Sequence, residues 1–260
     1  MDFLFFEDWI RTMPQWIQGS PKWLQDLFYQ VYQTLIYNDR WMLFVKGLQI
    51  TFIVTLGALV LGVLLGFIVA LIRTAHDDLS AAKKSNPLLN FFNAICKIYL
   101  TIIRGTPMMV QLLIMGFVIM TPKTDTGMII CGIVTLGINS GAYVAEIARS
   151  GLISIPSGQM EAGRSLGFNY VQTMWYVVIP QAFRNILPAL GNEMITLLKD
   201  TSLVSVIALR DVTKQAQNLV NKTYQAFVPY ITLALIYLTL VLILTWLLGR
   251  LERRLRRSDH

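Results

Sequence analysis

The sequence has little charge: only 14% of its 260 residues are Asp, Glu, Lys or Arg, whereas 55% are hydrophobic. A soluble domain of this size carries roughly 25% charged residues. Apolar runs recur along the chain instead, each near the length of about 20 residues that a helix needs to cross a bilayer. Because these runs are continuous rather than alternating, they indicate helices and not membrane strands. The composition therefore predicts an all-α membrane protein.

Residue types that carry chemistry are also scarce. The chain has two cysteines and two histidines, in no spacing typical of a disulfide or a metal centre. It contains no Gly-x4-Gly-Lys-Ser/Thr phosphate loop, so any ATP hydrolysis must occur on another polypeptide. We therefore expect no catalytic residues, no metal site and no cofactor bound by this chain. The net charge of +7 is attributed to cytoplasmic Lys and Arg, and no nucleic-acid partner is expected.

The apolar runs predict about five transmembrane helices, at residues 42–72, 98–120, 127–148, 180–207 and 229–249. The first is longer than a bilayer needs, so it should tilt or protrude. It carries Ala58, Gly62 and Gly66 at four-residue spacing, which predicts close helix packing. Thr106-Pro107 should break the second span, whose freed backbone groups then line a cavity.

Three segments follow from this pattern: residues 1–40, a transmembrane permease domain at 41–250, and a basic tail at 251–260. Residues 1–40 are rich in aromatic side chains, and Pro14 and Pro21 divide them into short pieces. We predict interfacial or extracytoplasmic helices here, not a span. The first eight residues lack a basic segment followed by an apolar stretch, so no cleaved signal peptide is expected.

The distribution of Lys and Arg predicts the orientation. With the C-terminus cytoplasmic, segments 73–97, 149–179 and 250–260 lie inside and hold 11 Lys and Arg residues, against 7 in the segments outside. The excess favours a cytoplasmic C-terminus and an N-terminus outside.

A polar insert at residues 149–179 separates two apolar segments on the cytoplasmic side. A first helix should begin near Pro156-Ser157 and end at Gly167, which tolerates a positive φ. Asn169 followed by Gln172 is typical of a capping box that starts a second helix. The insert is therefore predicted to be a helix–turn–helix. It serves either as a docking surface for a soluble partner or as an ordinary connecting loop.

Several motifs resemble the integral membrane subunits of binding-protein-dependent ABC importers. In the insert, the family's spacing Glu-Ala-Ala-x3-Gly-x9-Ile-x-Leu-Pro is matched by Glu161, Ala162, Gly167 and Pro180, with substitutions of similar size at Gly163, Val177 and Ile179. Further stretches resemble the polar amino acid subfamily, at residues 104–111, 139–149, 181–184, 199–207 and 251–255. The resemblance covers most of residues 43–255.

This resemblance implies a type I ABC importer permease fold in the bacterial inner membrane. It implies a dimer of ABC ATPase subunits that bind ATP and Mg, a second permease subunit that is identical or homologous, and an extracytoplasmic solute-binding protein. The substrate it implies is an amino acid, with basic, amide, acidic and sulfur-containing side chains all left open. The coupling residues it assigns are Glu161, Ala162, Gly163 and Gly167.

Ionisable groups at membrane depth are functional hypotheses by default. The charged candidates are Arg104, Glu146, Lys199 and Asp200, and the neutral ones are Gln111, Asn139, Ser140, Tyr143, Thr201 and Ser202. Together they supply donors for the carboxylate of an amino acid and acceptors for its ammonium group. The alternative is that the charged residues pair with one another and hold the helices in register.

Two other functions are compatible with a membrane helix bundle. An ion-coupled secondary amino acid carrier would use the buried charges as a relay, but such carriers usually show paired halves, and this chain has no internal repeat. A membrane enzyme is disfavoured because His76 and His260 lie outside the spans and no pair of acids or metal-binding spacing appears.

Overall fold

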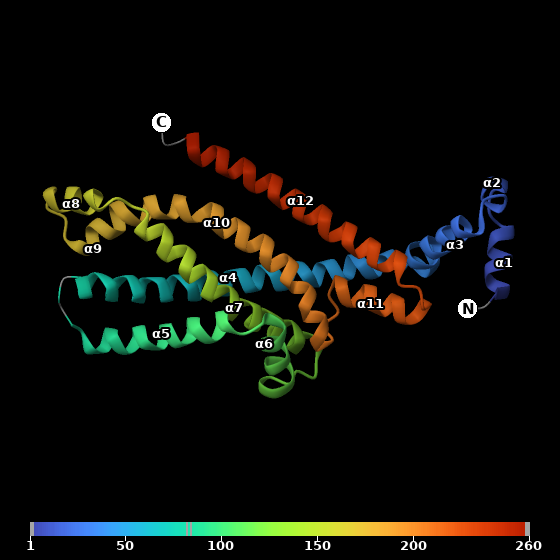
Figure 1. Cartoon of the computed structure of the whole chain (residues 1–260), viewed down its shortest axis with the longest axis horizontal. Helices are drawn as coiled ribbons and strands as arrows, with labels where there is room; N and C mark the ends of the chain where they lie inside the picture. Colours follow the sequence, from blue (N-terminus) through green and yellow to red (C-terminus); the bar gives the residue numbers. More distant parts are fainter. Residues whose placement is uncertain (1–2, 82, 84, 258–260) are drawn as a thin grey trace. The chain divides into compact units, whose positions relative to one another are not determined.

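The computed structural model describes residues 3–81, 83 and 85–257, and this part of the chain contains helices and connecting turns but no strand. The α-helices are α1 (Phe3–Arg11), α2 (Gln15–Gln18), α3 (Lys22–Val31), α4 (Trp41–Ala81), α5 (Pro87–Gly105), α6 (Met108–Ile114), α7 (Asp125–Ile153), α8 (Ser157–Ser165), α9 (Tyr170–Thr173), α10 (Ile179–Asp200), α11 (Val212–Thr223) and α12 (Phe227–Arg257) (Figure 1). Short π-helical segments are Tyr32–Ile36, Met115–Ile119 and Met174–Val178, and 3-10 segments are Tyr37–Asp39 and Thr201–Ile207.

The contacts within the chain define two compact units. The first contains the residues up to 50 together with residues 210–239, and the second contains residues 51–209 and those from 240 onward. The helices α4 and α12 each contribute to both. The boundaries predicted at residues 40 and 250 follow a different criterion, the membrane, and stay predictions; residues 258–260 of the basic tail lie outside the described residues.

The N-terminal helices of the first unit pack through aromatic rings. Pro14 and Pro21 directly precede α2 and α3, as the sequence predicted. The ring of Tyr29 on α3 lies 5.0 Å from that of Phe6 and 5.3 Å from that of Trp9 on α1. At nine, four and ten residues, α1, α2 and α3 are shorter than the roughly 20 residues needed to span a bilayer.

The first unit also contains α11, a helix that sequence analysis left as part of a connection. Val212, Ala216 and Leu219 recur at helical spacing and are buried against Phe44 of α4. A Cβ atom on Gly47 would lie 2.7 Å from the Cα of Val212, so only glycine permits this approach of α4 to α11. Helix α11 is thus held against α4 by its apolar face. The segment is polar on average, so this face is not evident from its composition.

In the second unit, α4 packs closely against α7 along the predicted stripe of small residues. A Cβ on Gly62 would lie 2.9 Å from the Cβ of Ser140, and one on Gly66 would lie 2.6 Å from the Cβ of Val144. Ala58 is fully buried. The prediction of close packing at this stripe is confirmed.

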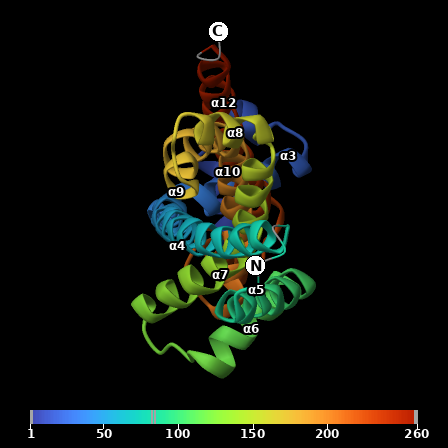
Figure 2. The same ribbon diagram turned by 90° about the vertical axis from the view of Figure 1, so that its left-hand side faces the viewer.

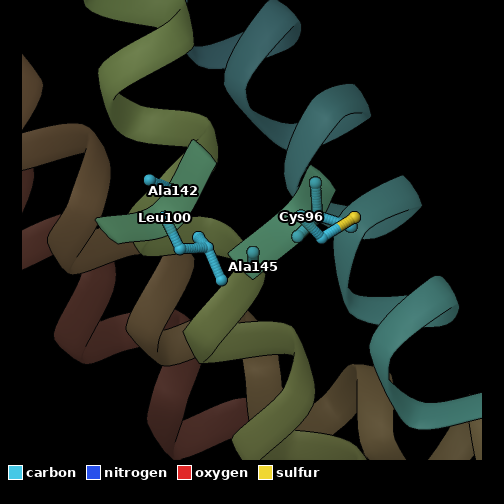
Figure 3. Close-up of a cluster of buried hydrophobic side chains, with 5 residues drawn as sticks. Cys96, Leu100, Ala142 and Ala145 are labelled. Carbon is cyan, nitrogen blue, oxygen red and sulfur yellow. The ribbon is translucent and has the colours of Figure 1, made fainter. Parts of the chain in front are cut away.

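Helix α5 packs against α7 and lies beside the C-terminal part of α4 (Figure 1). Cys96 and Leu100 of α5 meet Ala142 and Ala145 of α7 in a buried cluster, to which α4 adds Val69 (Figure 3). The two alanines have small side chains, so the larger side chains of α5 fill the space between α5 and α7. Neither cysteine forms a disulfide.

The predicted break at Thr106-Pro107 is confirmed. Helix α5 ends at Gly105, α6 begins at Met108, and the two helical stretches are bent by 106°. Thr106 is extended, with φ −119° and ψ 143°, because a residue before proline is pushed out of the helical region.

Three described helices are long and apolar enough to cross a membrane: α4, α7 and α12. The bent pair Pro87–Gly105 and Met108–Ile119 forms a fourth crossing if it is counted as one span. The 41 residues of α4 make a helix about 60 Å long, about twice the roughly 30 Å apolar core of a bilayer, so α4 protrudes.

The fourth predicted span corresponds to α10 and the 3-10 segment after it, and α10 is not among these apolar helices. It contains Pro188 and ends in Lys199 and Asp200. Its apolar side is covered within the unit: Ala182 and Ile186 are buried against Ala148 of α7. A helix covered in this way can carry polar groups at membrane depth.

Candidate functional site

The polar insert folds as the two predicted helices. Helix α8 begins after Pro156 and is closed by two hydrogen bonds, from the Phe168 amide to the Gly163 carbonyl (3.1 Å) and from the Gly167 amide to the Arg164 carbonyl (2.9 Å). This is a Schellman ending, and Gly167 supplies the positive φ of 84° that it requires. A capping box between Asn169 and Gln172 then starts α9.

The coupling candidates of this insert differ in exposure. Glu161, Ala162 and Gly167 are exposed, and a Cβ on Gly167 would meet nothing within 4 Å. Gly163 is buried instead, with Thr173 of α9 pressed against the position its Cβ would occupy. Gly163 therefore brings α8 and α9 together and does not lie on the open surface where we expected a partner to pack.

Several large apolar side chains of the insert are exposed. Leu166, Val171, Trp175 and Tyr176 have exposed fractions of 75%, 71%, 65% and 67%. We call this group the insert ridge. They are not evident as a group in the sequence, because Leu166 and Val171 interrupt polar stretches one at a time. Clustered exposed apolar residues mark interaction surfaces in proteins.

The insert lies at the end of the second unit where α4 also ends (Figures 1 and 2). The Tyr170 hydroxyl of α9 donates a hydrogen bond to Asp78 of α4. One residue earlier, Asp77 accepts a hydrogen bond from Arg149 of α7 at 2.8 Å. Helix α4 therefore contacts both the insert and the helix that leads into it, and these contacts continue α4 to Ala81, nine residues beyond its predicted end at residue 72.

A cavity of about 620 Å³ lies between the insert and the ends of α4 and α7. Its lining includes Asp78, Arg164 and Tyr170. Burial, followed by the hydrogen bond to Asp78, raises the pKa of the Tyr170 hydroxyl, so this group remains a proton donor at physiological pH.

Glu146 is the centre of a charged cluster inside the second unit. One of its oxygens lies 3.1 Å from a guanidinium nitrogen of Arg73 on α4 and 3.4 Å from one of Arg104 on α5. Arg104 also stands over the ring of Tyr143, 5.7 Å from its centre. Arg104 and Glu146 thus pair with each other, which agrees for these two residues with the alternative that the charged candidates hold the helices in register. Arg73 was missed, because it directly follows the apolar run that defined the first span.

The side chain of Gln111 holds the break between α5 and α6. Its amide nitrogen donates to the carbonyls of Ile103 (2.7 Å) and Thr106 (3.2 Å), which the bend leaves without helical partners. Its amide oxygen accepts from Asn139 of α7 at 3.0 Å. Gln111 and Asn139 thus lie together, as a shared site requires.

Ser140 lies beside Asn139 in sequence but faces α10. It is buried, and its hydroxyl donates to Glu193 at 2.7 Å. Glu193, a residue of α10, was not among the site candidates. The serine therefore joins α7 to α10, separately from the Glu146 cluster.

The remaining candidates lie at the end of α10. Neither Lys199 nor Asp200 forms an ion pair with another described residue, so the alternative that all four charged candidates pair with one another does not hold for these two. Thr201 is fully buried and donates to the Leu198 carbonyl at 2.6 Å, and the Ser202 carbonyl accepts from Ser205. These two residues serve the helix end.

The Glu146 cluster borders an open cavity. A cavity of about 470 Å³ between α7 and α10 is lined by Glu146, Ser150, Ser154 and Asn185 among others. The side chains of Arg104 and Glu146 keep 45% and 34% exposure, and Tyr143 keeps 41%. The described residues contain no group of three or more His, Cys, Asp or Glu side chains able to hold a metal ion.

The chain is thus a helical membrane protein with a projecting helix pair, α8 and α9, and a polar interior. Comparison with known proteins identifies its class. The chain belongs to the family described as binding-protein-dependent transport system inner membrane components, which matches residues 80–257. It is a multi-pass inner-membrane permease with the type I ABC importer fold. The match gives no support to the ion-coupled carrier.

Named relatives are permeases of amino acid transport systems. The chain is 36% identical over 217 residues to the arginine transport system permease protein ArtQ of Bacillus subtilis, covering 82% of this chain and 93% of the relative. It is 33% identical over 216 residues to the glutamine transport system permease protein GlnP of Escherichia coli, with the same coverage. It is 33% identical over 224 residues to the L-cystine transport system permease protein TcyB of Bacillus subtilis, covering 86% and 91%.

Solved structures agree. An amino acid ABC transporter crystallised with histidines matches at a TM-score of 0.71 and 42% identity, covering 82% of this chain and 94% of the other. The inward-facing methionine ABC transporter MetNI matches at a TM-score of 0.66 and 20% identity, with coverage of 82% and 96%. The second likeness concerns the fold alone.

Proposed function

We propose that this chain is the membrane-spanning translocation subunit of an ATP-driven importer for a polar amino acid. ATP, with Mg, is hydrolysed on a separate pair of ABC ATPase subunits that bind the insert. A second permease subunit, identical or homologous, completes the pathway, and an extracytoplasmic solute-binding protein delivers the substrate. The observation that carries the proposal is the insert ridge on a helix pair fastened to α4, within a chain that lacks a phosphate loop.

The insert transmits movement because it is tied to three long helices. It continues through the π-helical segment Met174–Val178 into α10, it follows directly from α7, and Tyr170 bonds it to α4. A partner that grips the ridge therefore pulls on the helices that carry the interior polar groups. Three coupling candidates are exposed on the insert, where the partner would bind: Glu161, Ala162 and Gly167. Gly163 keeps α8 and α9 in contact.

The Glu146 cluster is suited to an amino acid. Arg104 offers a guanidinium for the carboxylate, and Glu146 offers a carboxylate for the ammonium group. Without substrate, Glu146 pairs with both Arg73 and Arg104, and a zwitterion inserts between Glu146 and Arg104. Gln111 and Asn139, fixed at the helix break, and the ring of Tyr143 provide neutral contacts to the substrate side chain.

The orientation follows from the charges. The ridge and the Arg-rich C-terminus are placed in the cytoplasm, and the N-terminus is placed outside, as the excess of 11 over 7 Lys and Arg residues favours. The ATPases then bind on the cytoplasmic side and the solute-binding protein on the other.

Reconstituted uptake tests the pathway. The complex is placed in proteoliposomes with ATP and its binding protein, and uptake of labelled amino acids is measured for the wild type and for Asn139→Ala combined with Tyr143→Ala. We expect a raised KM or an altered order of substrates, with complex assembly unchanged. Unchanged affinity and selectivity would remove the pocket from the proposal and leave selection to the binding protein.

A further inference from the structure

Arg73 reaches the Glu146 cluster from α4, although it lies outside the site that the sequence predicted. The helices α4 and α7 run parallel on this side of the second unit. Gly66 of α4 lies against α7 with no room for a methyl group, and about three turns farther along Asp77 bonds to Arg149 of α7 at 2.8 Å. Arg73 lies between these two contacts, so the packing of α4 on α7 holds its side chain beside Glu146.

Two guanidinium groups share the single carboxylate of Glu146. Arg73 donates a hydrogen bond to it at 3.1 Å, and the Arg73 side chain is only 18% exposed. Arg104 approaches the same oxygen at 3.4 Å and keeps 45% exposure. In the part of the chain that the structure describes, no other carboxylate lies within ion-pair distance of either arginine. The cluster therefore holds one guanidinium more than Glu146 needs, and the more loosely held one is Arg104.

A substrate carboxylate can bind Arg104 only if this guanidinium turns away from Glu146. With Arg104 as its sole partner, Glu146 would lose its compensating charge in that movement, which is strongly unfavourable at membrane depth. Because Arg73 keeps its hydrogen bond to Glu146, the carboxylate stays neutralised while Arg104 turns. The ring of Tyr143, 5.7 Å from the Arg104 guanidinium, offers a contact that does not depend on Glu146.

An ammonium group meets the opposite situation in this cluster. Its partner is Glu146, which is already bonded to Arg73, and both guanidinium groups repel it. The neighbouring pair of Asp77 and Arg149 adds no net charge. Two guanidinium groups against one carboxylate therefore make the cluster favour a carboxylate over an ammonium group.

We propose that Arg73 is a positioning residue for substrate recognition: it neutralises Glu146 and thereby releases Arg104 to bind the α-carboxylate of the amino acid. The inference rests on the function proposed above and states which group of the substrate the cluster selects. A purely structural role would be different, because an arginine that only fastened α4 to α7 would affect the binding of every ligand alike.

The test measures how the purified membrane complex discriminates between the two groups. Two analogues of L-glutamine are titrated into it by calorimetry: 4-carbamoylbutanoate, which lacks the ammonium group, and 4-aminobutanamide, which lacks the carboxylate. The variant Arg73→Gln removes the charge, and Arg73→Lys keeps it. Asp77→Asn is the matched control, because it removes the other ion pair between α4 and α7 without touching Glu146.

The measured quantity is the ratio of the two affinities, carboxylate analogue over ammonium analogue. We expect the wild type to bind the carboxylate analogue more tightly. Arg73→Gln should lower the ratio roughly tenfold or more, because Arg104 is then held by Glu146. Arg73→Lys should keep most of the ratio. Asp77→Asn should leave the ratio unchanged while lowering the midpoint of thermal unfolding, which shows that a weakened contact between α4 and α7 is not the cause.

Three results would overturn the role of Arg73: an unchanged ratio in Arg73→Gln, an equal fall of the ratio in Asp77→Asn, or no binding of either analogue to the wild type. ATP-driven uptake of labelled L-glutamine, L-arginine and L-cystine by the wild type is measured in parallel. Uptake together with an unchanged ratio counts only against Arg73. A ratio that falls in Arg73→Gln while the wild type takes up no amino acid counts only against the proposed function.

Discussion

At the scale of single residues, Tyr170 has the most direct consequence for coupling. Its hydroxyl joins the insert to Asp78 of α4 across 92 positions of sequence. Hydrogen bonds to charged groups contribute about 1.5–3 kcal/mol. Together with the ion pair between Arg149 and Asp77, this bond ties the insert to α4.

Replacing Tyr170 by Phe therefore should weaken the transmission of movement to α4. We expect ATP hydrolysis by the complex to continue while uptake per ATP falls, roughly tenfold if about 1.4 kcal/mol of coupling is lost. Tyr224→Phe is the control, because this tyrosine is 92% exposed, lies outside the insert, and has no described hydrogen bond from its hydroxyl. Parallel measurements of ATPase activity and uptake decide the matter, and equal uptake per ATP in both variants would show that the bond carries no coupling.

Asp211 gives a prediction of pH dependence in the first unit. Its carboxylate caps α11 by accepting from the amides of Thr213 (3.0 Å) and Lys214 (2.9 Å), yet it is fully buried. Burial dominates and raises the pKa of Asp211 from 3.8 to about 6. The raised pKa means that its contribution to stability is complete below pH 3.8 and is lost as the pH rises through about 6.

We expect this loss to reach about 3 kcal/mol, at 1.36 kcal/mol for each pKa unit. Asn caps helices as well as Asp but does not ionise. The midpoint of thermal unfolding of Asp211→Asn, relative to that of the wild type, should therefore be higher at pH 7 than at pH 4.5. A difference that stays constant over this range would show that Asp211 has an ordinary pKa.

At the scale of elements, the turn between α8 and α9 is the sharpest test of the insert. Gly167 has a φ of 84°, and its surroundings are open. A side chain there costs about 1–2 kcal/mol of backbone strain, least for Asn. We expect Gly167→Trp to insert normally but to abolish uptake, since its ring obstructs a docked partner, and Gly167→Asn to retain most activity. Normal uptake by Gly167→Trp would remove the docking role from this turn.

The stripe between α4 and α7 predicts a second matched pair. A methyl group on Gly66 would lie 2.6 Å from the Cβ of Val144, whereas one on Gly105 would meet nothing within 4 Å. Overpacking typically costs about 1–3 kcal/mol. We expect Gly66→Ala to lower the thermal midpoint in detergent and Gly105→Ala to leave it nearly unchanged. Equal midpoints would contradict the close contact of the two helices.

The elements that could be predicted from sequence are those with a local signal. The insert was predicted residue by residue, because a Schellman glycine, a capping box and a proline each act over a few positions. The break at Thr106-Pro107 was predicted for the same reason. Helix α11 and the length of α4 were not, because they depend on side chains that meet only in three dimensions, such as Phe44 with Val212 and Tyr170 with Asp78.

The polar interior was predicted in composition but only partly in arrangement. Arg104 with Glu146 and Gln111 with Asn139 do come together. Lys199 and Asp200 do not join them, and Arg73 and Glu193 enter instead. A list of polar residues at membrane depth does not say which face of each helix is covered, and that decides which groups meet.

At the scale of the whole molecule, the exposed ridge and the polar interior both belong to the second unit. Four large apolar side chains are exposed on the ridge. The central claim is therefore that this chain acts in a complex with ATPase subunits.

The most direct measurement is the composition of the complex that this chain forms. The tagged protein is purified from its native membranes in mild detergent, beside a variant with Leu166→Ser, Val171→Ser and Trp175→Ser on the ridge, and the co-purifying proteins are identified and counted. The account predicts a stoichiometric ATP-binding subunit with the wild type and its loss with the variant. A wild-type chain that purifies without any ATP-binding protein, under conditions that keep other ABC complexes intact, would contradict it.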